Sequence, residues 1–125
     1  KGVNMKVEIR TEKAVVKCNK ELMALAVSNY ISNAVKFAKG DKNVIITLEN
    51  KKKPYLITVY NDGDRISGEL KPHLWNAFTK EDKARTSGNG SGMGLALCKK
   101  IFDFHNCTYG FRNKEKGVEF WVMAE

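Results

Sequence analysis

The stretch that decides the fold lies at residues 88–97 and reads Gly88-Asn89-Gly90-Ser91-Gly92-Met93-Gly94-Leu95-Ala96-Leu97. Four of the chain's ten glycines fall here, directly before a segment that is helical by periodicity, residues 92–105. A helix start leaves backbone N–H groups without partners, and residues without side chains let a polyphosphate approach them closely. The stretch therefore favours an anion site, with a flexible linker ending in a helix cap as the alternative. Its spacing fits neither the Walker loop nor the dinucleotide fingerprint.

A long amphipathic helix is expected upstream, over residues 20–38. Apolar side chains recur there on one broad arc of the helical wheel, Asn19 is a candidate N-cap, and Gly40 follows the end. Asn29, Asn33 and Lys36 lie within roughly 60° of one another, beside that arc. Carboxamide oxygens suit Mg²⁺, which takes few protein ligands alongside phosphate oxygens. Asparagines on a solvated helix surface are the alternative.

The remaining elements follow from alternation and from turn residues. Asn61 to Ile66 reads as a strand end followed by a turn, which Asn, Asp and Gly explain well on their own. The expected strand pairs are residues 3–9 with 14–18, residues 44–49 with 55–60, and residues 107–112 with 118–124. Between residues 61 and 89 we expect a long, partly mobile loop region of the kind that is usually functional or disordered.

Four of these segments resemble the sequence boxes of sensor histidine kinases. Members of the same superfamily are gyrase B, the large heat-shock chaperone and the mismatch-repair ATPases. The resemblance lies in the N box at residues 28–37, the G1 box at 61–66, the F box at 75–78 and the G2 box at 88–97. The order and spacing match too, and the likeness runs over essentially the whole chain. It implies an α/β two-layer sandwich of the Bergerat type: a mixed sheet of about five strands, about three helices and a mobile lid over bound nucleotide.

The resemblance also assigns roles to matched positions. Asn33 is similar to the asparagine that binds Mg²⁺ between the phosphates, with Asn29 and Lys36 as flanking contacts. Asn61 stands where the family has an aspartate that accepts a hydrogen bond from the adenine amino group. The resemblance further implies that nucleotide contacts come from Gly63, Ile66, Phe78, Lys80, Arg85, Gly90, Ser91, Gly92, Met93, Gly94 and Leu95.

Three positions depart from the family pattern. Asn61 offers one acceptor oxygen where the aspartate offers two, Arg65 replaces the second glycine of the G1 box, and Val118 stands where a threonine is common. Asn29 occupies the place of the glutamate that activates water in the hydrolases of the superfamily. The resemblance therefore implies a kinase that keeps the γ-phosphate for a histidine; a serine kinase or ATPase of the same fold, or a degenerate nucleotide sensor, is the alternative.

Two groups outside the boxes have competing interpretations. Trp75 and Phe78 are either core anchors or the hydrophobic plug by which the lid docks onto the phosphoacceptor helices, and the polar, glycine-rich flanks favour the plug. Neither His73 nor His105 has the acidic neighbour of a phosphoacceptor histidine, and His105 is better explained as a packed structural residue.

Composition sets the frame for these assignments. The chain has 125 residues and a formal net charge of +8, which suits one domain over residues 1–125 with an anionic partner. Three cysteines at unrelated spacings favour a reduced compartment. The resemblance implies ATP and Mg²⁺ as cofactors, a separate histidine-bearing dimerisation domain and a response regulator as partners, and no nucleic acid. We expect a cytoplasmic domain cut from a longer bacterial kinase that is homodimeric and anchored in the membrane.

Overall fold

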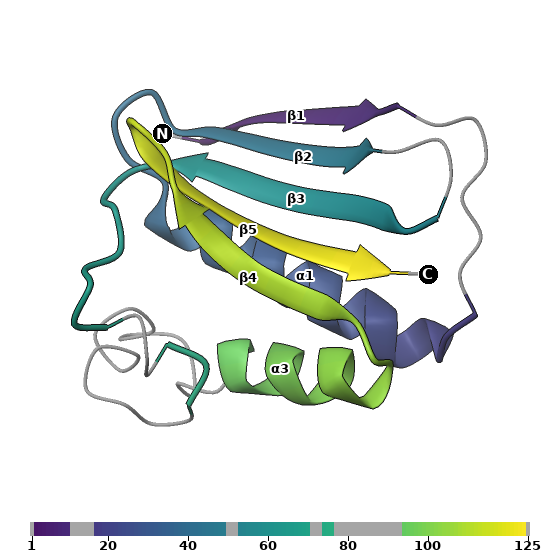
Figure 1. The fold of residues 1–125 in the computed structure, drawn as a ribbon. Coiled ribbons are helices and arrows are strands. Elements are labelled where there is room, and N and C mark those ends of the chain that lie inside the picture. Colours follow the sequence, from purple (N-terminus) through teal and green to yellow (C-terminus); the bar gives the residue numbers. More distant parts are fainter. Residues whose placement is uncertain (1, 11–16, 50–52, 71–73, 77–93, 125) are drawn as a thin grey trace.

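The computed structural model describes residues 2–10, 17–49, 53–70, 74–76 and 94–124. They form one five-stranded mixed sheet with two helices on one of its faces (Figure 1). The elements are β1 (Asn4–Ile9), α1 (Lys20–Phe37), β2 (Asn43–Glu49), β3 (Tyr55–Asp62), α3 (Gly94–Phe104), β4 (Thr108–Asn113) and β5 (Gly117–Ala124). This confirms the expected α/β sandwich of about five strands. Of the roughly three helices expected, the described residues contain two.

The strand order is β1-β2-β3-β5-β4. Pairing is antiparallel throughout except between β1 and β2, which are parallel. The two later strand pairs were predicted correctly. The pairing of β1 with β2 was not predicted for the first strand, whose expected partner was residues 14–18. Of those residues, 14–16 lie outside the described part of the chain, and Lys17 and Cys18 lie outside any strand.

Helix α1 begins and ends close to the positions predicted from its pattern. The Asn19 side chain accepts a hydrogen bond from the Leu22 N–H at 3.0 Å, as an N-cap should. The helix buries a narrow face of Ala26, Tyr30 and Ala34, and small residues on that face let the helix approach the sheet and α3 closely.

Tyr30 is the centre of the core. Its ring lies 5.4 Å from those of Phe102 and Phe120 and 6.2 Å from that of Trp75, in tilted or edge-on geometry. Its hydroxyl donates to the backbone carbonyl of Trp121 at 3.1 Å. One side chain of α1 thus joins the core of α3, β5 and the segment at residues 74–76.

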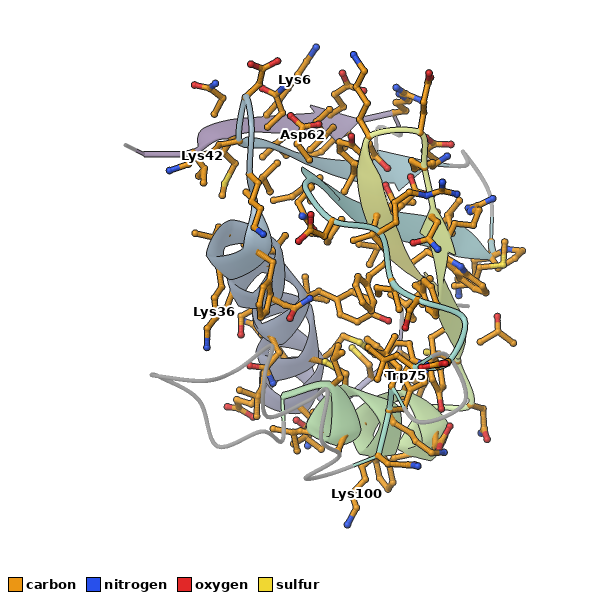
Figure 2. The ribbon with its side chains drawn as sticks, turned by 90° about the vertical axis from the view of Figure 1, so that its left-hand side faces the viewer. Lys6, Lys36, Lys42, Asp62, Trp75 and Lys100 are labelled. Carbon is orange, nitrogen blue, oxygen red and sulfur yellow. The ribbon has the colours of Figure 1, made fainter. Side chains whose placement is uncertain are left out.

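Trp75 packs against the core as a partly buried side chain, so the anchor interpretation holds, and its role in docking onto the phosphoacceptor helices stays a prediction. Its ring packs edge-on against Tyr109 at 5.0 Å and Phe120 at 5.8 Å, and it lies beside α3 (Figure 2). Phe78, the other half of the expected plug, lies outside the described residues.

His105 has a structural place, as its sequence context indicated. Its Nε2 accepts a hydrogen bond from the Asn19 N–H at 3.0 Å. Nδ1 lies 2.8 Å from the Ile101 carbonyl oxygen and, with Nε2 accepting, carries the proton that it donates there. The imidazole therefore ties the end of α3 to the start of α1.

The edge strand β1 is the least covered part of the sheet. Met5, Val7 and Ile9 are exposed by 48, 58 and 65%, and the residues between them are Lys6 and Glu8. None of the helices in the described ranges has the length and hydropathy to cross a bilayer.

Candidate functional site

The best-defined part of the candidate site is the end of β3. Asn61 is 1% exposed, although its side chain is polar. Its Nδ2 donates to the Asp62 carbonyl oxygen at 2.9 Å, and this bond fixes the orientation of the amide. Oδ1 is buried and has no hydrogen-bond partner among the described residues. A buried acceptor without a partner is costly, so this atom is suited to a donor from a bound molecule.

The turn after Asn61 is wedged against the end of α1. Gly63 has φ +147°, and a Cβ at this position would lie 2.6 Å from the Phe37 carbonyl oxygen. The Lys39 N–H donates to the Asp62 carbonyl oxygen at 2.9 Å, and the Gly63 N–H donates to that of Lys116 at 3.0 Å. Glycine is required here by the protein's own packing, before any ligand is considered. Arg65 is exposed, and its φ is not among the positive values of the described non-glycine residues, so it fits the turn.

Gly117 is a site residue to which the sequence assigned no role. It pairs with Asp62 across β3 and β5, and an added Cβ would lie 2.0 Å from the Asn61 backbone oxygen and 2.9 Å from its carbonyl carbon. The sequence showed only a glycine ahead of a strand pattern, which is an ordinary turn signal.

The face of α1 beside the core carries the three predicted polar residues. The Nδ2 atom of Asn33 is buried without a partner among the described residues, so this side chain does not point into bulk solvent. Burial raises the pKa of the Cys98 thiol to about 12, and a hydrogen bond with the Asn29 side chain opposes the rise. Asn29 therefore faces α3. Lys36 is exposed and points away from the sheet (Figure 2).

The first turn of α3 contains Gly94 and Leu95, the last two nucleotide contacts predicted in the glycine stretch. A Cβ added to Gly94 would meet no described residue within 4 Å. The Leu95 side chain is 5% exposed and belongs to the core, which leaves only its backbone to contact a ligand. The other predicted contacts lie outside the described residues: Phe78, Lys80, Arg85, Gly90, Ser91, Gly92 and Met93.

Ile66 completes the described part of the site. Its side chain is 4% exposed and belongs to the hydrophobic core. The structure thus brings Asn61, Gly63 and Ile66 together on one turn, next to the end of the helix that carries Asn33.

Hydrogen bonds to the Asp62 carboxylate hold the first part of this turn in place. The carboxylate accepts hydrogen bonds from the Tyr60 hydroxyl at 2.7 Å and from the Asn43 N–H at 3.0 Å. Desolvation acts to raise the pKa of Asp62, but these hydrogen bonds outweigh it and hold the pKa below its usual range. Desolvation and the bond to Asp62 raise the pKa of Tyr60 to about 12. Both groups keep their ordinary charge states at neutral pH.

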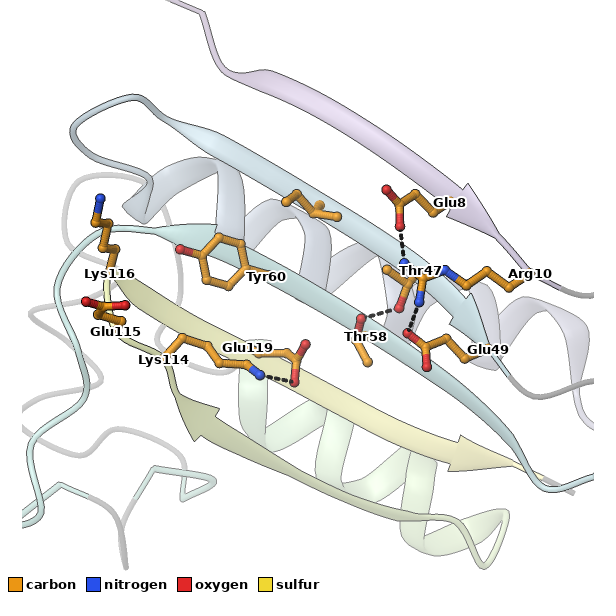
Figure 3. Close-up of a pocket in the computed structure, with 11 residues that line it drawn as sticks. Glu8, Arg10, Thr47, Glu49, Thr58, Tyr60, Lys114, Glu115, Lys116 and Glu119 are labelled. Carbon is orange, nitrogen blue, oxygen red and sulfur yellow. Dashed lines mark hydrogen bonds and ion pairs between the residues drawn. The ribbon is translucent and has the colours of Figure 1, made fainter.

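Two cavities are lined by described residues of the sheet and its turns. One of about 500 Å³ lies on the sheet face away from the helices, and none of the predicted site residues lines it (Figure 3). Its Glu8 and Glu49 carboxylates are already paired with Arg10. A second cavity of about 490 Å³ lies at the turn itself, between Asp62, Gly63 and Asp64 and the residues that follow α1. We place the site at the Asn61 turn and α1, because unpartnered buried polar atoms lie there.

The described residues contain no group of three or more His, Cys, Asp or Glu side chains that could hold a metal ion. A metal at this site would therefore depend on amide ligands and on oxygens supplied by a bound phosphate.

Comparison with known proteins identifies the fold family. The sequence profile of the histidine kinase-, DNA gyrase B-, and HSP90-like ATPases matches residues 18–125. The sensor protein GtcS of Aneurinibacillus migulanus is 33% identical over 101 residues, which cover 81% of this chain and 27% of that protein. The heme sensor protein HssS of Staphylococcus aureus strain JH9 is 31% identical over 106 residues, or 85% of this chain and 22% of that protein.

A structural relative agrees with these sequence matches. The catalytic domain of the histidine kinase ThkA, in a nucleotide-free form, superposes with a TM-score of 0.84 at 26% identity. The superposition covers 98% of this chain and 78% of that domain. The chain spans about a quarter of the length of the curated sensor proteins it matches. With a family profile over residues 18–125 and a matching fold, the chain belongs to the family of histidine kinase-, DNA gyrase B-, and HSP90-like ATPases.

Proposed function

We propose that this chain, as a single domain over residues 1–125, binds Mg·ATP and donates the γ-phosphate to a histidine on a separate dimerisation domain. It would serve as the catalytic domain of a two-component sensor histidine kinase. The observation that carries the proposal is the buried, unpartnered Oδ1 of Asn61, with its amide already oriented by the bond to Asp62.

The residues present fit an adenine base. The adenine amino group is a donor of the kind that Asn61 Oδ1 lacks. Ile66 lies on the same turn with a side chain that is 4% exposed, so it would border the base through that small surface, and the close packing of Gly63 against α1 holds the turn in place. In this proposal Asn61 selects the base, while Gly63 and Ile66 shape its pocket.

The residues on α1 fit the phosphates and Mg²⁺. Asn33 would hold the metal through the oxygen of its side-chain amide, and Asn29 and Lys36 would flank it. When bound, Mg²⁺ neutralises charge on the phosphate oxygens, and phosphoryl transfer depends mainly on such positioning and electrostatics. From the family resemblance we further propose contacts from Phe78, Lys80, Arg85, Gly90, Ser91, Gly92, Met93, Gly94 and Leu95.

Asn29 supports a kinase in preference to a hydrolase. A carboxamide is not a general base, so it does not activate water for attack on the γ-phosphate. The Asn29 side chain acts to lower the pKa of the Cys98 thiol of α3, and that thiol donates to the Ala26 carbonyl oxygen of α1 at 3.3 Å. A neutral imidazole needs no such base, because its unprotonated nitrogen already has a lone pair.

The partners and location follow from the same proposal. The histidine acceptor would lie on the parent kinase's own dimerisation domain, and a response regulator would receive the phosphoryl group downstream. We propose that the domain works in the bacterial cytoplasm and that its homodimeric parent is anchored in the membrane.

The test is calorimetric titration of Mg·ATP into the wild-type chain and the variants Asn33→Ala and Asn61→Ala. Asn4→Ala is the matched control, because its amide donates to the Asp41 carbonyl at 3.0 Å on the edge strand and Asn4 is not among the residues assigned to the nucleotide. We expect the wild type and the control to bind alike and both site variants to bind at least about tenfold more weakly, since each loses one buried polar contact.

A second step tests the reaction. The chain is mixed with Mg·[γ-³²P]ATP and a separate helical hairpin that carries a phosphoacceptor histidine. Label on the hairpin alone is expected. Release of phosphate without labelling would instead favour an ATPase, and nucleotide binding with neither reaction would favour a nucleotide sensor. Unaltered affinity in both site variants would refute the proposed pocket.

A further inference from the structure

One side chain of β4 binds the backbone of the G1 turn at two points. The Ile66 N–H donates to Oδ1 of Asn113 at 2.9 Å, and Nδ2 of Asn113 donates to the Ile66 carbonyl oxygen at 2.8 Å. The two residues are 47 positions apart in the sequence. Both backbone groups of Ile66 are therefore satisfied by a single carboxamide.

Asn113 also lies in the same row of the sheet as Asn61. Val118 of β5 pairs with Asn61 on one side and with Asn113 on the other, and it is fully buried. Side chains that lie opposite one another across a sheet project from the same face. The row thus carries the free acceptor Oδ1 of Asn61 and, one strand beyond Val118, the amide that holds Ile66.

We propose that Asn113 is a positioning residue that fixes the apolar wall of the base pocket and thereby sets the selectivity for adenine; this rests on the proposed function. Asn113 does not itself contact the nucleotide. It holds the Ile66 backbone, so the Ile66 side chain stays packed in the core and borders the base only through the small part of its surface that is not buried.

The geometry explains why one amide carries this role. The Gly63 N–H donates to the Lys116 carbonyl oxygen, and three residues further on the Asn113 side chain binds both backbone groups of Ile66. Loss of Asn113 leaves the Ile66 N–H and carbonyl without these partners, so water competes for them and the segment opens more often. Each opening removes the wall that holds a base against Asn61 Oδ1, so it weakens a nucleotide whose base binds there and spares one that is held by its phosphates alone.

The test measures Mg·ADP and Mg·GDP dissociation constants for the wild type, Asn113→Ala and Asn113→Ser, with Asn4→Ala as control. Guanine has a carbonyl oxygen at the position where adenine has its amino group, so from that position it cannot donate a hydrogen bond to Asn61 Oδ1. We expect Asn113→Ala to weaken ADP binding roughly tenfold, in line with two lost hydrogen bonds, and to leave the weaker GDP binding nearly unchanged. Serine can replace one of the two bonds, so Asn113→Ser should fall between.

The ratio of the two constants separates positioning from general destabilisation. Partial unfolding scales both constants by the same factor, since it lowers only the folded fraction, and leaves the ratio unchanged. An unchanged ratio in Asn113→Ala, or failure of both Asn113 variants to fold beside a folded Asn4→Ala, would overturn the inference and leave the proposed function standing. Absence of ADP binding by the wild type, or equal binding of both purines, would refute the base pocket itself.

Discussion

Replacing Gly117 by alanine should damage both the stability of the domain and its nucleotide site. The added Cβ would lie 2.0 Å from the Asn61 backbone oxygen and 3.0 Å from the Asp62 Cα. Both are backbone atoms of a neighbouring central strand, so no side-chain rotation can relieve the clash. To make room, β5 must separate from β3 at the turn that carries the candidate site.

The magnitude follows from two opposing effects. Overpacking in a well-packed interior costs about 1–3 kcal/mol and sometimes more, and a backbone contact this close belongs at the upper end. Restricting the unfolded chain by a Gly to Ala change recovers only about 0.4–1 kcal/mol. We therefore expect a net loss of about 2–3 kcal/mol, which corresponds to a fall in Tm of roughly 10 °C for a domain of this size.

Gly68→Ala is the matched control, because a Cβ there would meet nothing within 4 Å. Urea denaturation gives the free energy of unfolding of each variant, and calorimetry gives the Mg·ATP affinity. Gly68→Ala should be as stable as the wild type or slightly more so. If Gly117→Ala unfolds within about 0.5 kcal/mol of Gly68→Ala, the range usual for neutral surface changes, the steric reasoning is wrong.

Three further changes test the packing and electrostatics. Tyr30→Phe removes the hydroxyl bond to the β5 backbone and should lower the free energy of unfolding by about 1 kcal/mol; an unchanged urea midpoint would contradict this. Asn19→Ala removes the N-cap bond and should cost about 1 kcal/mol by the same measurement, with helical circular dichroism retained below the transition. The bonds from Tyr60 and Asn43 hold the pKa of Asp62 low, so its contribution is present above about pH 4 and is lost as pH falls through the lowered pKa. Stability of Asp62→Asn should therefore vary less below pH 4 than that of the wild type, and identical pH profiles would refute this.

Periodic segments were predicted well from the sequence. The helix expected over residues 20–38 is α1, Lys20–Phe37, because its apolar arc and the Asn19 cap are local signals. The β2–β3 and β4–β5 pairs could be predicted equally well, since short turns join antiparallel strands that are neighbours in the sequence.

The pairing of strands that are distant in the sequence could not be predicted. The alternation of β1 predicted a strand but not its partner, because two-residue periodicity specifies a face and leaves the neighbour open. The sequence therefore predicted a partner adjacent in the chain and did not predict the parallel pairing of β1 with β2. The core contacts of Trp75 could not be predicted for a similar reason: its flanks are polar, and the rings that pack against it come from α1, β4 and β5.

Some residues of the candidate site could likewise be predicted from local sequence, and others could not. Asn33, Asn61 and Gly63 stand out in the sequence as polar or flexible residues in defined boxes, and their assigned roles in nucleotide binding stay predictions. Gly117 and Asn113 gave no comparable signal. Their importance depends on distances to β3 and to the G1 turn, which no local pattern contains.

The edge strand β1 has a consequence for how the protein behaves at high concentration. An uncovered edge with a row of apolar side chains is a template on which other chains can add strands and grow into aggregates. The charges of Lys6 and Glu8 on the opposite face of β1, and of Arg10 just after it, form ion pairs and act as gatekeepers beside that row. Neutralising these three residues would leave the fold intact but turn β1 into a nucleus for precipitation.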